Sequence, residues 1–301
     1  MGSAKGKMSV NSAVIRRVVF AVVVLNLLAL FGGMVAAHET GEAGSDEGGV
    51  IDAYEGTGPV MLDEAIRQNT MQAVVAGAAL LAALVAVSIL VKRKKGKPKP
   101  VVLHFLFWPI IAVIVAVTAY VAGSTIYLNV VSETNGPIHW HADFEVWRCG
   151  EQHQLVDPKG FSNRVGETVL HEHGDNRMHI EGVVVDYRDV SIGSFFRSVG
   201  GDLHPGWLAL PTNHGLVTIK DGDSCPGGPG TLQVFVWKTL DGKAVQEKLG
   251  GYYEDYVPSP HGNIPPGDCI ILEFDSEVKG KTGRMCESYK VAIKRGALNG
   301  G

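Results

Sequence analysis

Long apolar runs, rather than alternating patterns, dominate the first 131 residues of the chain. Residues 18–37, 70–91 and 101–131 are each long enough to cross a hydrocarbon core of about 30 Å as a helix. The second helix is expected to begin near residues 61–64, where acidic side chains suit an N-terminal turn. The pattern therefore predicts a two-helix transmembrane hairpin over residues 67–131.

The first apolar run has two interpretations. Arg16-Arg17 before it and Val35-Ala36-Ala37 at its end resemble a cleavable secretory signal. Its length, about 20 residues, favours a retained membrane helix. Residues 1–37 are therefore predicted to be a transmembrane helix or a signal peptide. The acidic, glycine-rich stretch that follows cannot bury enough apolar surface to fold, so residues 38–66 are predicted to be an extracytoplasmic linker.

Charge is distributed unevenly around the apolar runs, and this sets their predicted orientation. Lysine and arginine precede the first run and fill the short connection 92–99, whereas acidic residues outnumber basic ones eight to one between the first and second runs. Because loops rich in lysine and arginine face the cytoplasm, the connection 92–99 is predicted to be a cytoplasmic turn. Residues 132–301 then form an extracytoplasmic domain, and we expect a multi-pass protein of the cell membrane.

Beyond the last apolar run the pattern changes to short alternating segments. Residues 139–147 carry histidine and acidic side chains on one face and apolar side chains on the other, which predicts a strand. Cys149-Gly150-Glu151 predicts a turn, and residues 152–156 the returning strand of a hairpin. Further strands are predicted at residues 167–173, 178–185, 216–220, 231–239 and 268–274.

One helix is predicted within this domain. Ser191 is a suitable N-cap for a helix that runs through Val199 and ends at Gly200-Gly201. A loop rich in glycine and proline is expected after it, and the tail beyond Asp275 shows little pattern apart from residues 289–293. A hairpin, a helix and further strands together predict an α+β domain.

Four segments of this domain carry a resemblance to a known family: HADFEVWRCGE, HEHGDNRMHIEGVVV, DVSIGSFF and YEDYVPSPHGNIPPGDCIILEF. Together they resemble a family of uncharacterised, membrane-anchored, His-rich extracytoplasmic domains of bacteria and archaea, whose C-terminal part is similar to the last strands of a β-grasp fold. The resemblance covers most of residues 139–275 and implies a β-grasp-like domain, but it supplies no reaction. The chain departs from the family pattern in an insertion between Gly201 and Gly230 and in its four cysteines.

Histidine is the residue type that points to chemistry. Six of the eleven histidines lie between His139 and His179. His139 and His141 project from one strand face about 7 Å apart, and His171 and His173 are expected to do the same on another strand. His179, just beyond the Gly174 turn, can join or replace one of them. Neutral imidazole is the commonest transition-metal ligand, so this pattern predicts a zinc or copper site.

Asp143 shares the phase of His139 and His141, and it is predicted either to bind the metal or to fix a histidine tautomer. Glu172, Asp175 and Glu181 are candidate general bases beside a metal-bound water, although nothing in the sequence distinguishes them from surface carboxylates.

Three alternatives to a zinc or copper site remain open. The histidines can simply be polar residues on an exposed strand face, or a cluster that charges together on mild acidification in an adhesion or assembly module. His139, His141 and Glu145, with His179 as a later histidine, also resemble the first metal-binding motif of the cupins, which would make the protein a metal-dependent enzyme. The glycine spacing and the predicted helix do not follow the cupin pattern.

Cysteine usage agrees with export. Cys149, Cys225, Cys269 and Cys286 all lie in the C-terminal domain and none forms a CxxC pair. An even number outside the membrane predicts up to two disulfides in any of three pairings, with four reduced buried thiols as the alternative.

The sequence thus predicts a non-enzymatic, membrane-anchored domain that binds zinc or copper for metal binding, handling or delivery. The lipid bilayer is its expected partner. No Asp, Glu, Lys or Arg lies within the predicted membrane spans, so the chain offers no transport pathway of its own, and a membrane transporter or assembly partner would have to move the metal. Nucleic acid is not expected as a partner, because residues 132–301 hold 16 basic residues against 23 acidic ones.

Overall fold

The structure is a computed structural model that describes residues 62–93, 100–161, 163–259 and 267–300. It divides into two compact units, one holding most of the two long helices and the other holding the C-terminal domain. The predicted N-terminal helix or signal peptide, most of the acidic linker and most of the basic turn lie outside the described residues.

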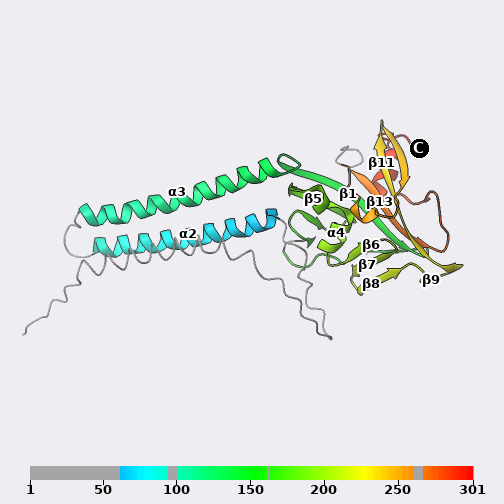
Figure 1. Ribbon diagram of the computed structural model, residues 1–301, viewed down its shortest axis with the longest axis horizontal. Coiled ribbons are helices and arrows are strands. Elements are labelled where there is room, and N and C mark those ends of the chain that lie inside the picture. The colour runs from blue at the N-terminus through cyan, green and yellow to red at the C-terminus, as the bar shows by residue number, and fades with distance from the viewer. Residues whose placement is uncertain (1–61, 94–99, 162, 260–266, 301) are drawn as a thin grey trace, which may run out of the picture. The chain divides into compact units, whose positions relative to one another are not determined.

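The helical unit consists of α2 (Leu62–Arg93) and α3 (Pro100–Val131), which run side by side (Figure 1). Asp63 and Glu64 occupy the first turn of α2, where carboxylates interact favourably with the helix dipole. Gly77 allows the two helices to approach closely, because a Cβ atom there would lie 2.7 Å from a methyl group of Val117. Both helices are long and apolar enough to cross a membrane, which confirms the predicted helices, while their membrane placement stays a prediction.

The C-terminal domain is built on an eight-stranded mixed sheet in the order β12-β11-β13-β1-β5-β4-β3, with β2 paired to β1. The strands β6, β7 and β8 form a second, three-stranded sheet, and β9 and β10 form a two-stranded ribbon. The bounds of the strands are β1 (Pro137–Arg148), β2 (Glu151–His153), β3 (Val165–Gly166), β4 (Leu170–Glu172), β5 (Arg177–Val183), β6 (Asp202–His204), β7 (Trp207–Thr212), β8 (Gly215–Lys220), β9 (Ser224–Cys225), β10 (Gly228–Pro229), β11 (Thr231–Leu240), β12 (Lys243–Lys248) and β13 (Asp268–Asp275).

The first and last strands of the domain lie together in the middle of the large sheet. β1 and β13 pair in parallel, with Phe144 opposite Ile270, whereas the other pairs in this sheet are antiparallel. The mixed α+β fold class is confirmed. The likeness to a β-grasp fold stays a prediction.

The main hydrophobic core lies on one face of the large sheet. Phe144 of β1 packs edge-to-face against Phe195 of α4 (Ile192–Ser198), with ring centroids 5.1 Å apart. The side chain of Ser191 caps α4 by accepting a hydrogen bond from the amide of Ser194, as predicted from the sequence. A short 3₁₀ turn at Tyr187–Val190 precedes α4, and another at Tyr253–Asp255, between β12 and β13, contacts α4.

A second, smaller core lies on the other face and is covered by α5 (Glu287–Lys294). Tyr289 of α5 is fully buried against Phe235 of β11 and Ile271 of β13. Because Ile270 and Leu272 belong to the main core and Ile271 to the smaller one, strand alternation places the two cores on opposite faces of the sheet.

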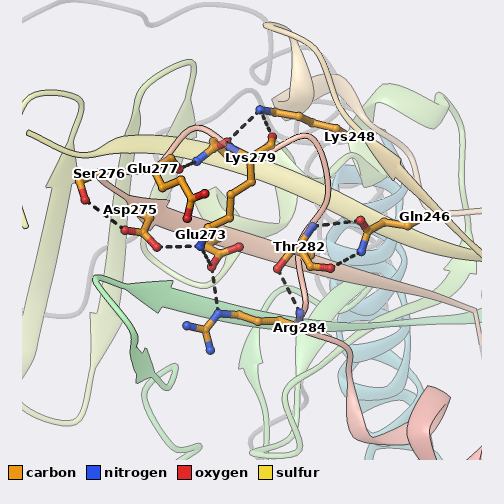
Figure 2. Close-up of polar contacts among 10 residues, drawn as sticks. Gln246, Lys248, Glu273, Asp275, Ser276, Glu277, Lys279, Thr282 and Arg284 are labelled. Carbon is orange, nitrogen blue, oxygen red and sulfur yellow. Dashed lines mark hydrogen bonds and ion pairs between the residues drawn. The ribbon is translucent and has the colours of Figure 1, made fainter. Parts of the chain in front are cut away.

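A polar network joins the segment after β13 to this face of the sheet (Figure 2). The buried Oε1 of Glu273 accepts hydrogen bonds from Nζ of Lys279 at 2.9 Å and from Nε of Arg284 at 3.1 Å. Gln246 and the backbone of Thr282 exchange two hydrogen bonds beside it. The network fixes the path of the chain between β13 and α5.

All four cysteines form disulfides, Cys149 with Cys225 and Cys269 with Cys286. The sequence left the pairing open, and the alternative of four reduced thiols is wrong. The first disulfide ties the β1–β2 turn to the ribbon of β9 and β10, and the second ties β13 to the start of α5. Disulfides are typical of proteins in an oxidising compartment.

Most predicted elements of the domain are present, including the hairpin, the helix after Ser191 and the strands near residues 216, 231 and 268. The prediction of a glycine- and proline-rich loop after α4 is wrong for residues 202–212, because this segment forms β6 and β7. Gly206, with φ of +70°, forms the tight turn between these two strands, so the glycine there marks a hairpin rather than an irregular loop.

Candidate metal centre

Strand register places three histidines in one row across the sheet. His141 of β1 lies opposite His179 of β5, and His171 of β4 lies opposite His179 from the other side. The ring centroids are 4.7 Å apart for His141 and His179, and 5.5 Å apart for His171 and His179. Residues far apart in the sequence are therefore brought within reach of a common ion.

These histidines lie on the sheet face away from the main core. Their strand neighbours Ala142, Ile180 and Leu170 are fully buried in that core, so alternation directs the histidines to the other side. His171 and His179 are nevertheless buried, whereas His141 is partly exposed and His139 is exposed. The histidine cluster therefore extends from the exposed His139 at the surface to the buried His171 and His179.

The tight turn between β4 and β5 brings the HEH segment next to His179. Gly174 and Asn176 have φ of +82° and +56°, values that glycine and asparagine tolerate best. Glu172 stabilises this turn, because its Oε1 accepts hydrogen bonds from the amides of Asp175 at 2.6 Å and Asn176 at 2.9 Å. The candidate general base Glu172 is therefore a turn-capping residue.

Glu181 completes the cluster from β5, opposite His139 of β1. Its Oε1 lies 2.9 Å from Nε2 of His139 and 3.7 Å from Nδ1 of His179. Its Oε2 lies 3.9 Å from Nε2 of His171. A carboxylate among imidazoles adds an anionic ligand, which lowers the cost of binding a dication in a partly buried site.

Two histidines have one ring nitrogen already engaged by a protein acceptor. Nε2 of His179 lies 3.3 Å from Oδ2 of Asp175, and Nδ1 of His173 is hydrogen-bonded to the backbone carbonyl of Asn163. Such contacts fix the tautomer of a metal-binding histidine and leave its other nitrogen free to bind the ion. The remaining nitrogen of His179, Nδ1, is therefore available to a metal, whereas the remaining nitrogen of His173, Nε2, contacts the ring of His171.

Two buried nitrogens of the cluster have no hydrogen-bond partner among the described residues, Nδ1 of His171 and Nδ1 of His179. Nε2 of His171 lies 3.1 Å from Nε2 of His173. Buried polar atoms are normally paired, so an unpaired nitrogen in such a cluster calls for an explanation. A metal ion bound by Nδ1 of His179 would supply one.

The potential ligand atoms form two overlapping groups. The first contains His139, His141, His179 and Glu181, and the second contains His171, His173, His179 and Glu181. Within each group the atoms lie within 4.8 Å of one another. Ligands at 2.0–2.1 Å around a tetrahedral zinc ion are about 3.4 Å apart, so small side-chain movements would bring these atoms to that geometry.

Electrostatics keep part of the cluster neutral. Burial, followed by the neighbouring His179 and His139, lowers the pKa of His141 to about 4. Burial likewise lowers the pKa of His171, against the opposing effect of Glu181. Both rings are therefore unprotonated at neutral pH, which is the form that binds metals.

The structure does not bring Asp143 and Glu145 into the cluster, although both share the strand phase of His139 and His141. Asp143 forms an ion pair with Arg177, its cross-strand neighbour, at 2.6 Å. Glu145 accepts a hydrogen bond from the indole of Trp147 at 2.8 Å. Neither belongs to the groups of potential ligands that the described residues form.

Sequence reasoning treated Glu181 and Asp175 only as candidate bases. Glu181 lies among the potential ligands, and the carboxylate of Asp175 contacts Nε2 of His179. The one signal for Glu181 is its spacing, because a residue two positions after His179 in a strand projects from the same face. Asp175 carries no comparable signal, since its contact depends on the turn.

No protein-family model, curated protein or solved structure matches this chain.

Proposed function

We propose that this protein is a membrane-anchored, extracytoplasmic domain that binds zinc or copper through the histidines of β1, β4 and β5, through His173 just after β4, and through Glu181. One observation carries the proposal: strand register brings together four histidines and a carboxylate from distant parts of the sequence, and His173, just after β4, joins them in groups whose ligand atoms lie within 4.8 Å. Imidazole donors favour zinc and copper over magnesium or calcium, which prefer oxygen ligands.

Two further observations support a metal site over a merely polar strand face. The buried Nδ1 of His179 has no hydrogen-bond partner among the described residues, while its Nε2 faces Asp175. A histidine with one unpaired ring nitrogen and a carboxylate at its other ring nitrogen is typical of metal sites. The cupin-like alternative is not proposed, because its carboxylate, Glu145, contacts Trp147 instead of the cluster.

The two disulfides and the basic connection between the helices support an extracytoplasmic placement. On that side of the membrane a histidine site can take up, buffer or deliver metal ions. Transfer across the bilayer would fall to a separate membrane transporter, because no charged residue lies within the apolar spans of α2 and α3.

Metal analysis of the full chain tests the proposal. The chain is purified in detergent, stripped with a chelator, reloaded with zinc or copper, and assayed by elemental mass spectrometry after removal of free ions. We expect stoichiometric metal in the wild type, strong loss in His179→Ala/Glu181→Ala, and retention in the matched control His214→Ala/Glu287→Ala at exposed positions. A wild-type chain without stoichiometric metal would overturn the proposal.

A further inference from the structure

The two carboxylate oxygens of Glu181 face different histidines. Oε1 points to His139 and His179, at 2.9 and 3.7 Å, whereas Oε2 lies 3.9 Å from His171. A carboxylate that binds one ion through each oxygen is a common bridge in sites with two metal ions about 3.5–4 Å apart. The positions of the two oxygens of Glu181 are therefore compatible with a bridge between two ions.

The number of donors also exceeds what one ion takes. Five histidines and Glu181 make six candidate ligands, whereas zinc with histidine ligands is almost always four-coordinate. The histidines separate into two pairs, His139 with His141 and His171 with His173, which belong to different groups of potential ligands. Only His179 and Glu181 belong to both groups.

We propose that the cluster binds two transition-metal ions bridged by Glu181, the first held by His139 and His141 and the second by His171 and His173. This inference rests on the proposed metal-binding function and extends it from one ion to two. The β5 strand lies between β1 and β4, so Glu181 of β5 lies between the two pairs of histidines and can reach both ions.

His179 belongs to the first ion. Its Nε2 faces Asp175, which leaves only Nδ1, and this atom lies near the same oxygen of Glu181 that faces His139. The first ion then has four protein ligands, and the second has three. Four protein ligands are typical of structural zinc, whereas a site with three keeps a position for water or another small ligand. The second ion is therefore the exchangeable one.

The stoichiometry of binding tests this inference. The stripped full chain in detergent is titrated with Zn²⁺, and bound zinc per chain is measured after free ions are removed. We expect two ions in the wild type and one in each of His139→Ala/His141→Ala and His171→Ala/His173→Ala. His204→Ala/His214→Ala, which removes two histidines outside the cluster, should still bind two.

Cu²⁺ provides a second measurement that does not depend on removing two histidines at once. Two Cu²⁺ ions sharing a carboxylate couple magnetically, so the electron paramagnetic resonance signal of the loaded wild type should account for fewer than two spins per chain. Glu181→Gln, which keeps the shape of the side chain, should weaken this coupling and restore the signal of each bound ion.

The outcomes separate the two proposals. One ion in the wild type, lost in both double variants, would overturn the two-ion site and leave a single metal site standing. Two copper ions with full, uncoupled signal in the wild type would overturn the bridging role of Glu181. A wild type that binds no ion would overturn both proposals.

Discussion

His141 of β1 and His179 of β5 are direct cross-strand neighbours, with their ring centroids 4.7 Å apart. The next pair on the same face of these strands is Asp143 and Arg177, which form an ion pair. A single register therefore decides which side chains of the polar face belong to the candidate metal site and which stabilise the sheet. A shift of one residue would turn all of these side chains to the opposite face.

Asp175 is expected to act on the metal through His179. Asp175→Asn removes the negative charge beside Nε2 of His179, so the tautomer of this histidine is fixed less firmly. Zinc affinity should then fall about 10–100-fold, the usual effect of losing such a partner. Competition with a chromophoric chelator measures this directly. Asp157→Asn changes a carboxylate that contacts Asn213 instead and serves as the matched control. Equal affinities in the two variants would refute the role of Asp175.

The candidate ligands on β1 were predictable from the sequence because strand alternation is local. His139 and His141 fall two residues apart, and Ala142 and Phe144, which follow in the alternate positions of β1, are buried as the predicted apolar face requires. Their partners were less predictable. Nothing local shows that β5 lies between β1 and β4, and the pairing of His171 with His179 depends on a turn held by Glu172.

Other parts of the fold escaped prediction for related physical reasons. The hairpin of β6 and β7 is interrupted by glycine and proline, which are more typical of loops, and its stability comes from burying residues such as Leu203 and Leu208. α5 is short and is held by packing of Tyr289 and by the disulfide at its N-cap, Cys286. Tertiary contacts of this kind leave little periodic signal.

The disulfide between Cys149 and Cys225 is expected to stabilise the domain more than the one between Cys269 and Cys286. The two bridges span 76 and 17 residues. Loop-closure entropy then predicts that the free energy of unfolding falls by about 4 kcal/mol when the Cys149–Cys225 bridge is removed. Removal of the Cys269–Cys286 bridge should lower it by about 3 kcal/mol. Paired Cys→Ser variants of the full chain, compared by denaturant unfolding followed through tryptophan fluorescence, measure both. A larger loss for the shorter loop would show that local packing outweighs chain entropy.

Glu273 should make the domain sensitive to acid. Although burial acts against it, hydrogen bonds from Thr282, Lys279 and Arg284 lower the pKa of Glu273 below its usual 4.5, and Asp275 shares Lys279. The stabilisation from this carboxylate is therefore present above about pH 4.5 and is lost as the pH falls through the lowered pKa.

The variant Glu273→Gln should lower the free energy of unfolding by about 1.5–3 kcal/mol at neutral pH, the range for hydrogen bonds to charged groups. It should also make the stability of the domain depend less on pH in the acid range. The unfolding midpoint measured between pH 6 and pH 3 checks this. Glu287→Gln, at an exposed position on α5, is the control and should follow the wild type. An unchanged pH dependence in Glu273→Gln would contradict the assignment.

The predicted membrane orientation can be tested separately with reporter fusions. A reporter fused after Lys97 should behave as cytoplasmic, because the surrounding segment is rich in lysine and arginine. A reporter fused after Gly301 should behave as external, on the side where the two disulfides can form. The opposite pair of results would place the histidine cluster in the cytoplasm and remove the extracytoplasmic role.

X-ray absorption at the zinc edge tests the metal site most directly. All four cysteines are in disulfides, so bound zinc should show only nitrogen and oxygen neighbours at about 2.0–2.1 Å, together with the outer-shell scattering of imidazole rings. The measurement uses the zinc-loaded full chain in detergent. A first shell of sulfur at about 2.3 Å, or of oxygen without imidazole scattering, would contradict binding by the histidine cluster.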